Sequence, residues 1–84
     1  MSATRKPAEV FHPGVFLREE FDTRNVQHKD VAEALGISPQ FLSDVLNGKR
    51  GIGTALAARL GRYLGTTPLL WLRLQDQWDM SAEL

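Results

Sequence analysis

The pattern of apolar and polar positions along the chain predicts five helices and no strand of comparable strength. Apolar residues recur at intervals of three and four, the spacing that places them on one side of a helix. The expected helices cover residues 13–24, 27 or 28–35, 39–47, 54–64 and 68–80. We therefore expect an all-α fold.

The stretch LGISPQFLSDVLNGKR, residues 35–50, carries signals for a turn and for both ends of a short helix. Gly36 ends the preceding helix, because a residue without a Cβ readily takes the left-handed conformation. Ser38 offers an N-cap hydroxyl, and Pro39 stands at the first helical position, where its missing N–H costs no hydrogen bond. Gly48 closes the helix. Two helices joined by such a turn form a helix-turn-helix.

The helix that follows this turn has two different faces. Leu42, Val45 and Leu46 form its apolar stripe. Its other face carries compact polar side chains, from Gln40, Ser43, Asp44 and Asn47. A helix that buries one side and presents short hydrogen-bonding groups on the other suits the major groove of DNA. The alternative is an ordinary solvated helix face.

Helix geometry assigns a role to each polar position, because the start of a recognition helix reaches base edges and its end reaches phosphates. Gln40 could bond adenine through N6 and N7, and Phe41 could touch a thymine methyl group. Asp44 could accept from cytosine N4, or it could instead hold a basic neighbour in place. Phosphate or sugar contacts are expected from Ser43, Asn47, His28 and Lys29, with positive charge from Lys49 and Arg50.

The last predicted helix has more apolar surface than its own core can use. Trp71, Leu74 and Trp78 fall on one face, with Leu70 beside them. Leu69 and Leu72 lie well round from that stripe. A terminal helix of a small domain cannot bury two apolar faces internally, so we expect the second face to meet a partner.

The sequence also supports predictions for single residues outside the helix-turn-helix. We expect Thr54 to cap the fourth helix, and Gly61 inside it to mark a close approach of backbone. His12 precedes a proline and should help to cap the first helix, while Phe11 should pack onto the domain. Arg18, like Glu19 and Asp22 on the same helix, is expected to face water.

Composition restricts the classes of function. Ten basic and ten acidic side chains cancel within 84 residues, which is too short a chain for two cores. Without a basic excess, DNA binding must depend on a few placed contacts, doubled by dimerisation. No apolar run approaches the about 18 residues of a membrane span, and the start of the chain lacks a signal-peptide core. We expect a cytoplasmic protein that does not bind membranes.

Catalysis and metal binding find little support in the sequence. There is no Cys, and the two histidines have no third ligand at metal-site spacing. Ser, His and Asp all occur, but nothing places a nucleophile beside a base in a pocket. We expect no cofactor and no enzyme activity.

Three segments resemble the HigA-type antitoxins of the Xre/Cro-like helix-turn-helix group. They are HPGVFLREEF (12–21), LGISPQFLSDVLNGKRGI (35–52) and RYLGTTPLLWLRLQDQWD (62–79). The NGKR element is common to the broad group, whereas the opening HPG and the RYxGT…WLxLQ ending are more specific. Gly61 departs from the usual Ala. The resemblance implies a five-helix domain over residues 12–80, after an N-terminal segment 1–11 and before a tail of residues 81–84, too short to wrap a toxin.

The resemblance also implies partners. Such proteins act as homodimers at the nucleoid, repress their own operon through a palindromic operator, and neutralise a HigB-type toxin, a RelE-like mRNA endonuclease. Dimerisation would fall to Leu69, Leu70 and Leu72. The expected DNA contacts are Ser38, Pro39, Gln40, Phe41, Ser43, Asp44, Asn47, Lys49, Arg50, His28 and Lys29. Two alternatives stay open: a stand-alone regulator without a toxin, and a helix-turn-helix interaction module that no longer binds DNA.

Overall fold

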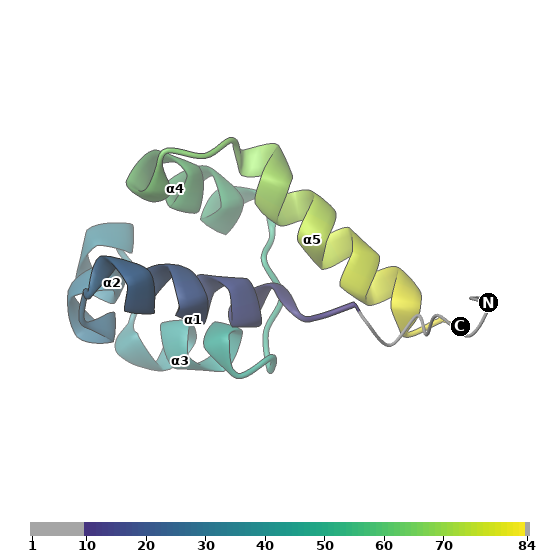
Figure 1. The fold of residues 1–84 in the computed structure, drawn as a ribbon, viewed down its shortest axis with the longest axis horizontal. Helices are drawn as coiled ribbons and strands as arrows, with labels where there is room; N and C mark the ends of the chain where they lie inside the picture. The colour runs from purple at the N-terminus through teal and green to yellow at the C-terminus, as the bar shows by residue number, and fades with distance from the viewer. Residues whose placement is uncertain (1–9, 84) are drawn as a thin grey trace.

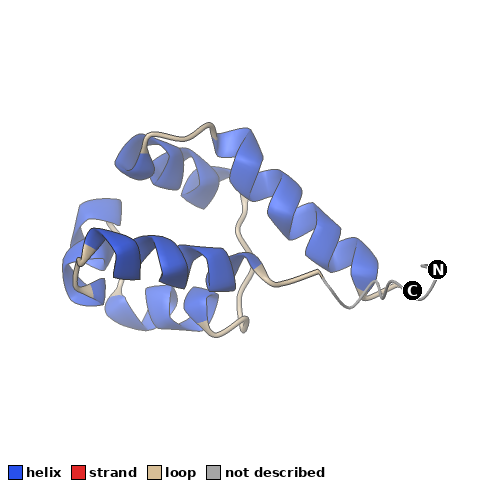
Figure 2. Ribbon diagram, in the orientation of Figure 1, coloured by secondary structure: helices blue, strands red, loops and turns tan. Residues whose placement is uncertain are grey.

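The computed structural model describes residues 10–83, and this part of the chain contains five helices and no strand (Figures 1 and 2). In chain order they are α1 (Pro13–Arg24), α2 (His28–Leu35), α3 (Pro39–Leu46), α4 (Thr54–Leu64) and α5 (Pro68–Ser81). The predicted all-α, five-helix fold is confirmed. Residues 1–9 of the expected N-terminal segment and Leu84 of the tail lie outside the described residues.

All five helices contribute to a single core. α1 lies beside α3, α4 packs against the start of α5, and the rest of α5 extends away from the other helices (Figure 1). The buried apolar side chains are Leu17, Phe21, Val31, Ala32, Leu35, Leu42, Val45, Leu46, Ile52, Leu56, Ala57, Leu60, Leu64 and Trp71. α5 contributes only Trp71 to this set, and its other apolar side chains are partly buried or exposed.

The helix ends follow the local signals with one exception. The Ser38 hydroxyl accepts from the backbone N–H of Phe41 at 3.0 Å, and Thr67 caps α5 through its own hydroxyl in the same way. The prediction for Thr54 is wrong: it is the first residue of α4, and Gly53 is the N-cap without a side-chain hydrogen bond.

The first turn of α1 lies directly against the last turn of α3. A Cβ on Gly14 would come within 2.8 Å of the Leu46 carbonyl oxygen, and closer still to that of Val45. The backbones can approach this closely because Gly14 has no side chain. The predicted close approach at Gly61 is also confirmed, because a Cβ there would lie 2.8 Å from the backbone oxygen of Thr66.

His12 connects three parts of the fold. Its Nδ1 accepts from the Gly14 N–H at 2.9 Å, which confirms the predicted cap of α1. Its ring is buried, stands edge-on to Trp78 of α5 at 5.5 Å between ring centroids, and lies beside Gly48 after α3. The neighbouring prediction for Phe11 is confirmed only in part: its ring stands edge-on to Phe16, but the residue is 54% exposed.

Burial lowers the pKa of His12 below its ordinary value of about 6.5, against the opposing influence of the Arg50 backbone and the Asp79 carboxylate. The unfolded chain therefore takes up this proton more readily than the folded chain. The stability contributed by neutral His12 is present above the unfolded pKa, and it is lost as the pH falls through the lower folded pKa.

We expect the free energy of unfolding to decrease between pH 7.5 and pH 5, and His12→Asn to reduce that decrease while keeping a side chain that can cap α1. Urea denaturation at several pH values measures the slope of the free energy of unfolding against pH for the wild type and for the variant. Carboxylates titrate in both proteins, so the difference between the slopes isolates His12. Equal slopes would contradict this role.

Candidate nucleic-acid interface

α2 and α3 are joined by the turn that the sequence predicts. Gly36 has a φ of 72°, in the left-handed region that favours glycine. The N–H of Ile37 donates to the Ala32 carbonyl at 3.0 Å, and the Ile37 side chain packs against the core. Ala32 of α2 is buried, and α2 packs against both α3 and α4. The two helices therefore have the connection of a helix-turn-helix.

The outer face of α3 is a set of preorganised polar side chains. Ser38, Pro39 and Gln40 at its start are exposed, whereas Ser43 is partly covered. The Asn47 amide, at the C-cap, donates to the Ser43 hydroxyl at 3.3 Å. Hydrogen bonds within the face fix these side chains before any ligand binds, which lowers the entropic cost of recognition.

Lys49 and Arg50 form a basic corner after α3, and Asp44 organises it. Its carboxylate accepts from the Gln40 amide at 2.9 Å and lies 3.9 Å from Nε of Arg50. The Arg50 guanidinium also lies 4.6 Å from the centroid of the half-buried Phe41 ring. The carbonyl of Asp44 accepts from the backbone of Lys49 at 2.8 Å. Asp44 therefore contacts both a predicted base reader and a predicted source of charge.

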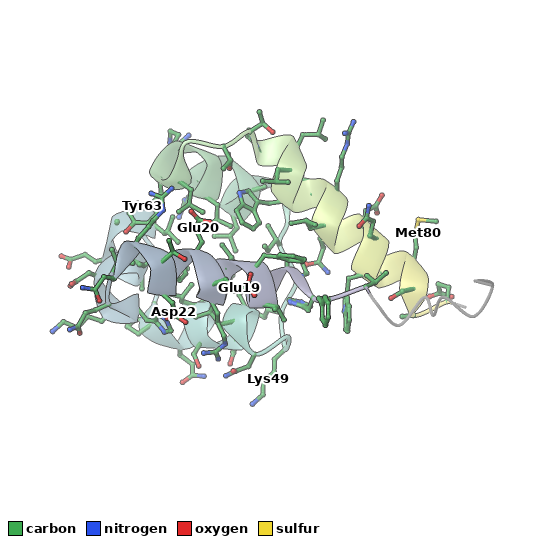
Figure 3. All side chains as sticks on the ribbon, in the orientation of Figure 1. Glu19, Glu20, Asp22, Lys49, Tyr63 and Met80 are labelled. Carbon is green, nitrogen blue, oxygen red and sulfur yellow. The ribbon has the colours of Figure 1, made fainter. Side chains whose placement is uncertain are left out.

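The remaining basic candidates are exposed. The Lys49 side chain projects from the lower edge of the molecule in Figure 3, beyond the end of α3. His28 and Lys29 form the exposed first turn of α2, and the His28 ring stands edge-on to Phe21 at 5.8 Å. Among the described residues, no group of three metal-ligating side chains comes together, and no helix is long and apolar enough to cross a membrane.

Arg18 has a role that the sequence reading missed. Although its side chain is largely exposed, Nε donates to the Leu46 carbonyl at 3.4 Å and Nη2 donates to the side-chain oxygen of Asn47. It thus caps the C-terminus of α3 from α1, instead of only facing water. Helical periodicity cannot reveal this contact, because the partners are 28 and 29 residues away in the sequence.

α5 holds the loop after the basic corner. The Gln75 side-chain oxygen accepts from the Ile52 N–H at 2.8 Å, and its amide lies directly against Gly51. The sequence reading missed this residue as well. The position of Lys49 and Arg50 therefore depends on α1 and on α5 in addition to α3.

The three leucines proposed for pairing do not share one surface. Leu69 and Leu72 line a depression of about 340 Å³ together with Ile52, Arg73, Gln75, Asp76 and Asp79. Leu70 lines a different groove, against α1. Leu69 and Leu70 are 50% and 42% exposed, whereas Leu72 is half-buried against the core. α5 therefore presents apolar side chains on two separate surfaces, the first of which also carries Arg73, Asp76 and Asp79.

Residues 17–72 match the helix-turn-helix family. The chain is 34% identical over 71 residues to the virulence-associated protein A' of Dichelobacter nodosus, an alignment that covers 83% of this chain and 62% of that relative, less than two thirds of its length. It is 38% identical over 80 residues to the antitoxin HigA-1 of Vibrio cholerae, covering 89% of this chain and 71% of that one.

Solved structures agree with these relatives. The structure of the Pseudomonas aeruginosa antitoxin HigA with the higBA promoter superposes with a TM-score of 0.84 at 32% identity, covering 88% of this chain and 82% of that one. The chain belongs to the helix-turn-helix family, as a HigA-type member of its Xre/Cro-like group. This is a family of regulators and antitoxins, not of enzymes.

We expect Arg18→Ala to destabilise the protein by about 1 kcal/mol, because the Leu46 carbonyl loses a charged donor. The backbone amides of Asn47 and Gly48, which donate to carbonyls of the last turn of α3, should exchange hydrogen faster. Urea denaturation and amide exchange by NMR measure these effects. Arg62→Ala is the matched control, since Arg62 is exposed on α4 and makes no such bond to α3. Equal effects from both variants would refute a specific role for Arg18.

Proposed function

We propose that this protein is a HigA-type antitoxin that binds operator DNA as a homodimer, represses its own operon and neutralises a HigB-type ribonuclease. The observation that carries this proposal is the preorganised polar face of α3, on a fold that superposes with an antitoxin solved with promoter DNA. Such activity would place the protein at the nucleoid in the cytoplasm.

Base reading would come from the start of α3. Gln40 is exposed, and one N–H of its amide remains available after the other donates to Asp44. That N–H and the side-chain oxygen suffice for a bidentate contact with adenine. Ser38 and Pro39 would lie nearest the bases, and Phe41 would touch a thymine methyl. For Asp44 the two contacts to Gln40 and Arg50 favour an orienting role over base reading.

Phosphate contacts would come from both ends of the motif. Lys49 and Arg50 follow α3, and His28 and Lys29 begin α2. Ser43 and Asn47 would add neutral hydrogen bonds. A net charge of zero supplies no general attraction to DNA, so these contacts would act through their position.

Dimerisation would place two copies of α3 about 34 Å apart, one turn of DNA, and would match a palindromic operator. Leu69 and Leu72 are the favoured pairing surface, because Leu69 is 50% exposed and both line the depression beside Ile52, next to the loop that carries the basic corner. Pairing on this side of α5 would position the two motifs relative to each other.

We expect Gln40→Ala to weaken binding to the chain's own promoter DNA by about 1–3 kcal/mol and to relax specificity at one base position. Lys49→Ala should instead weaken binding to all sequences and reduce the salt slope of log K by about one. Footprinting and titrations at two salt concentrations separate the two outcomes. An unchanged footprint for Gln40→Ala would exclude it as a base reader.

We expect Leu69→Glu to convert a dimer into a monomer and to abolish promoter binding at micromolar concentration, because a buried carboxylate opposes pairing. Light scattering with gel-shift titration measures both. Leu69→Met, which keeps the apolar surface, should behave as the wild type. A wild-type protein that is monomeric both on and off DNA would overturn the dimer proposal.

A further inference from the structure

A groove separates α1 from α5 on the side of α5 that does not carry Leu69. Its volume is about 410 Å³, and its lining comes from Phe16, Glu19, Glu20, Thr23, Thr66, Leu70, Trp71 and Leu74. No residue of this lining belongs to α3, and in Figure 3 Glu19 and Glu20 lie near the middle of the view on α1, whereas Lys49 lies at its lower edge. The groove therefore belongs to a surface separate from the outer face of α3.

The floor of the groove is apolar. Trp71 is 4% exposed, and its indole N–H is already satisfied by the Thr66 hydroxyl at 2.8 Å. Phe16 and Leu74 are half-buried beside it, and Leu70 leaves 42% of its surface open. An apolar side chain of a partner would displace water here without leaving a polar group unpaired.

The rim of the groove is acidic. Glu20 is paired with Arg24 at 3.1 Å, and the same guanidinium donates to the Leu64 carbonyl at 3.0 Å. Glu19 is exposed and belongs to neither ion pair found among residues 10–83. The groove thus combines an apolar floor with net negative charge at its edge, which complements an apolar residue flanked by Lys or Arg.

We propose that this groove is the docking site for the toxin ribonuclease, an assignment that rests on the antitoxin function proposed above. A ribonuclease that acts on mRNA must carry a basic surface, because its substrate is a polyanion. That surface is complementary to the acidic rim, and Leu70 would anchor the contact.

Charge also argues against the other occupants. DNA and anionic lipid surfaces are repelled by Glu19, whereas the charge of Glu20 is compensated by Arg24. A second copy of this chain is already assigned to the Leu69 and Leu72 surface, which leaves the groove to a different partner. Leu70 therefore serves the toxin, and Leu69 and Leu72 serve pairing, so one dimer can hold DNA and toxin at once.

The test uses the full-length protein and the small basic ribonuclease encoded beside it, purified separately and titrated by calorimetry. Leu70→Glu should weaken binding by at least about 30-fold, as expected for a central anchor. Glu19→Lys should weaken it by about 5-fold at low salt and less at high salt. Asp22→Lys changes the same charge on the same helix outside the groove lining, and it should bind as the wild type does.

The outcomes separate the two levels of the proposal. If no ribonuclease is encoded there, or the wild type does not bind it, the antitoxin function and this site fail together. If the wild type binds and both groove variants bind equally well, the groove assignment alone fails. Loss of dimer mass in Leu70→Glu without toxin would also overturn it. Circular dichroism checks folding, and the surface variant Glu19→Lys tests the site even if Leu70→Glu misfolds.

Discussion

The close contact between the first turn of α1 and the last turn of α3 is the constraint on which the candidate interface depends. Gly14 lets α1 approach the carbonyls of Val45 and Leu46 at the C-terminus of α3. Arg18, one turn further along α1, donates to one of these carbonyls. His12 caps α1 at the same junction and touches α5. A change in this contact would move α3 relative to the rest of the domain.

Three arginines of this domain make structural hydrogen bonds, so a zero net charge overstates the positive charge that is available to bind DNA. Arg18 donates to the C-terminus of α3, Arg24 to that of α4, and Arg59 to that of α2. Each neutralises the negative end of a helix dipole. Three of the ten Lys and Arg side chains are therefore engaged in structural hydrogen bonds, and Arg50 at the end of α3 is held by Asp44 and Phe41.

The separation of surfaces on α5 gives the proposed functions a physical basis. One side faces the loop after the basic corner, and the other faces the acidic side of α1. Pairing through the first side would act on the spacing of the two recognition helices, whereas docking on the second would leave α3 uncovered. Repression and toxin neutralisation would then be compatible in one dimer.

The amino-acid sequence was sufficient to predict the five helices, the caps at Ser38 and Thr67, the turn at Gly36 and the two faces of α3, because these depend on contacts within a few residues. It also indicated the surplus apolar surface of α5. Only the tertiary structure showed that Arg18 holds Asn47, that Gln75 holds the loop, and that Leu70 lies apart from Leu69. Those relations depend on the angles at which α1, α3 and α5 cross, which local periodicity does not specify.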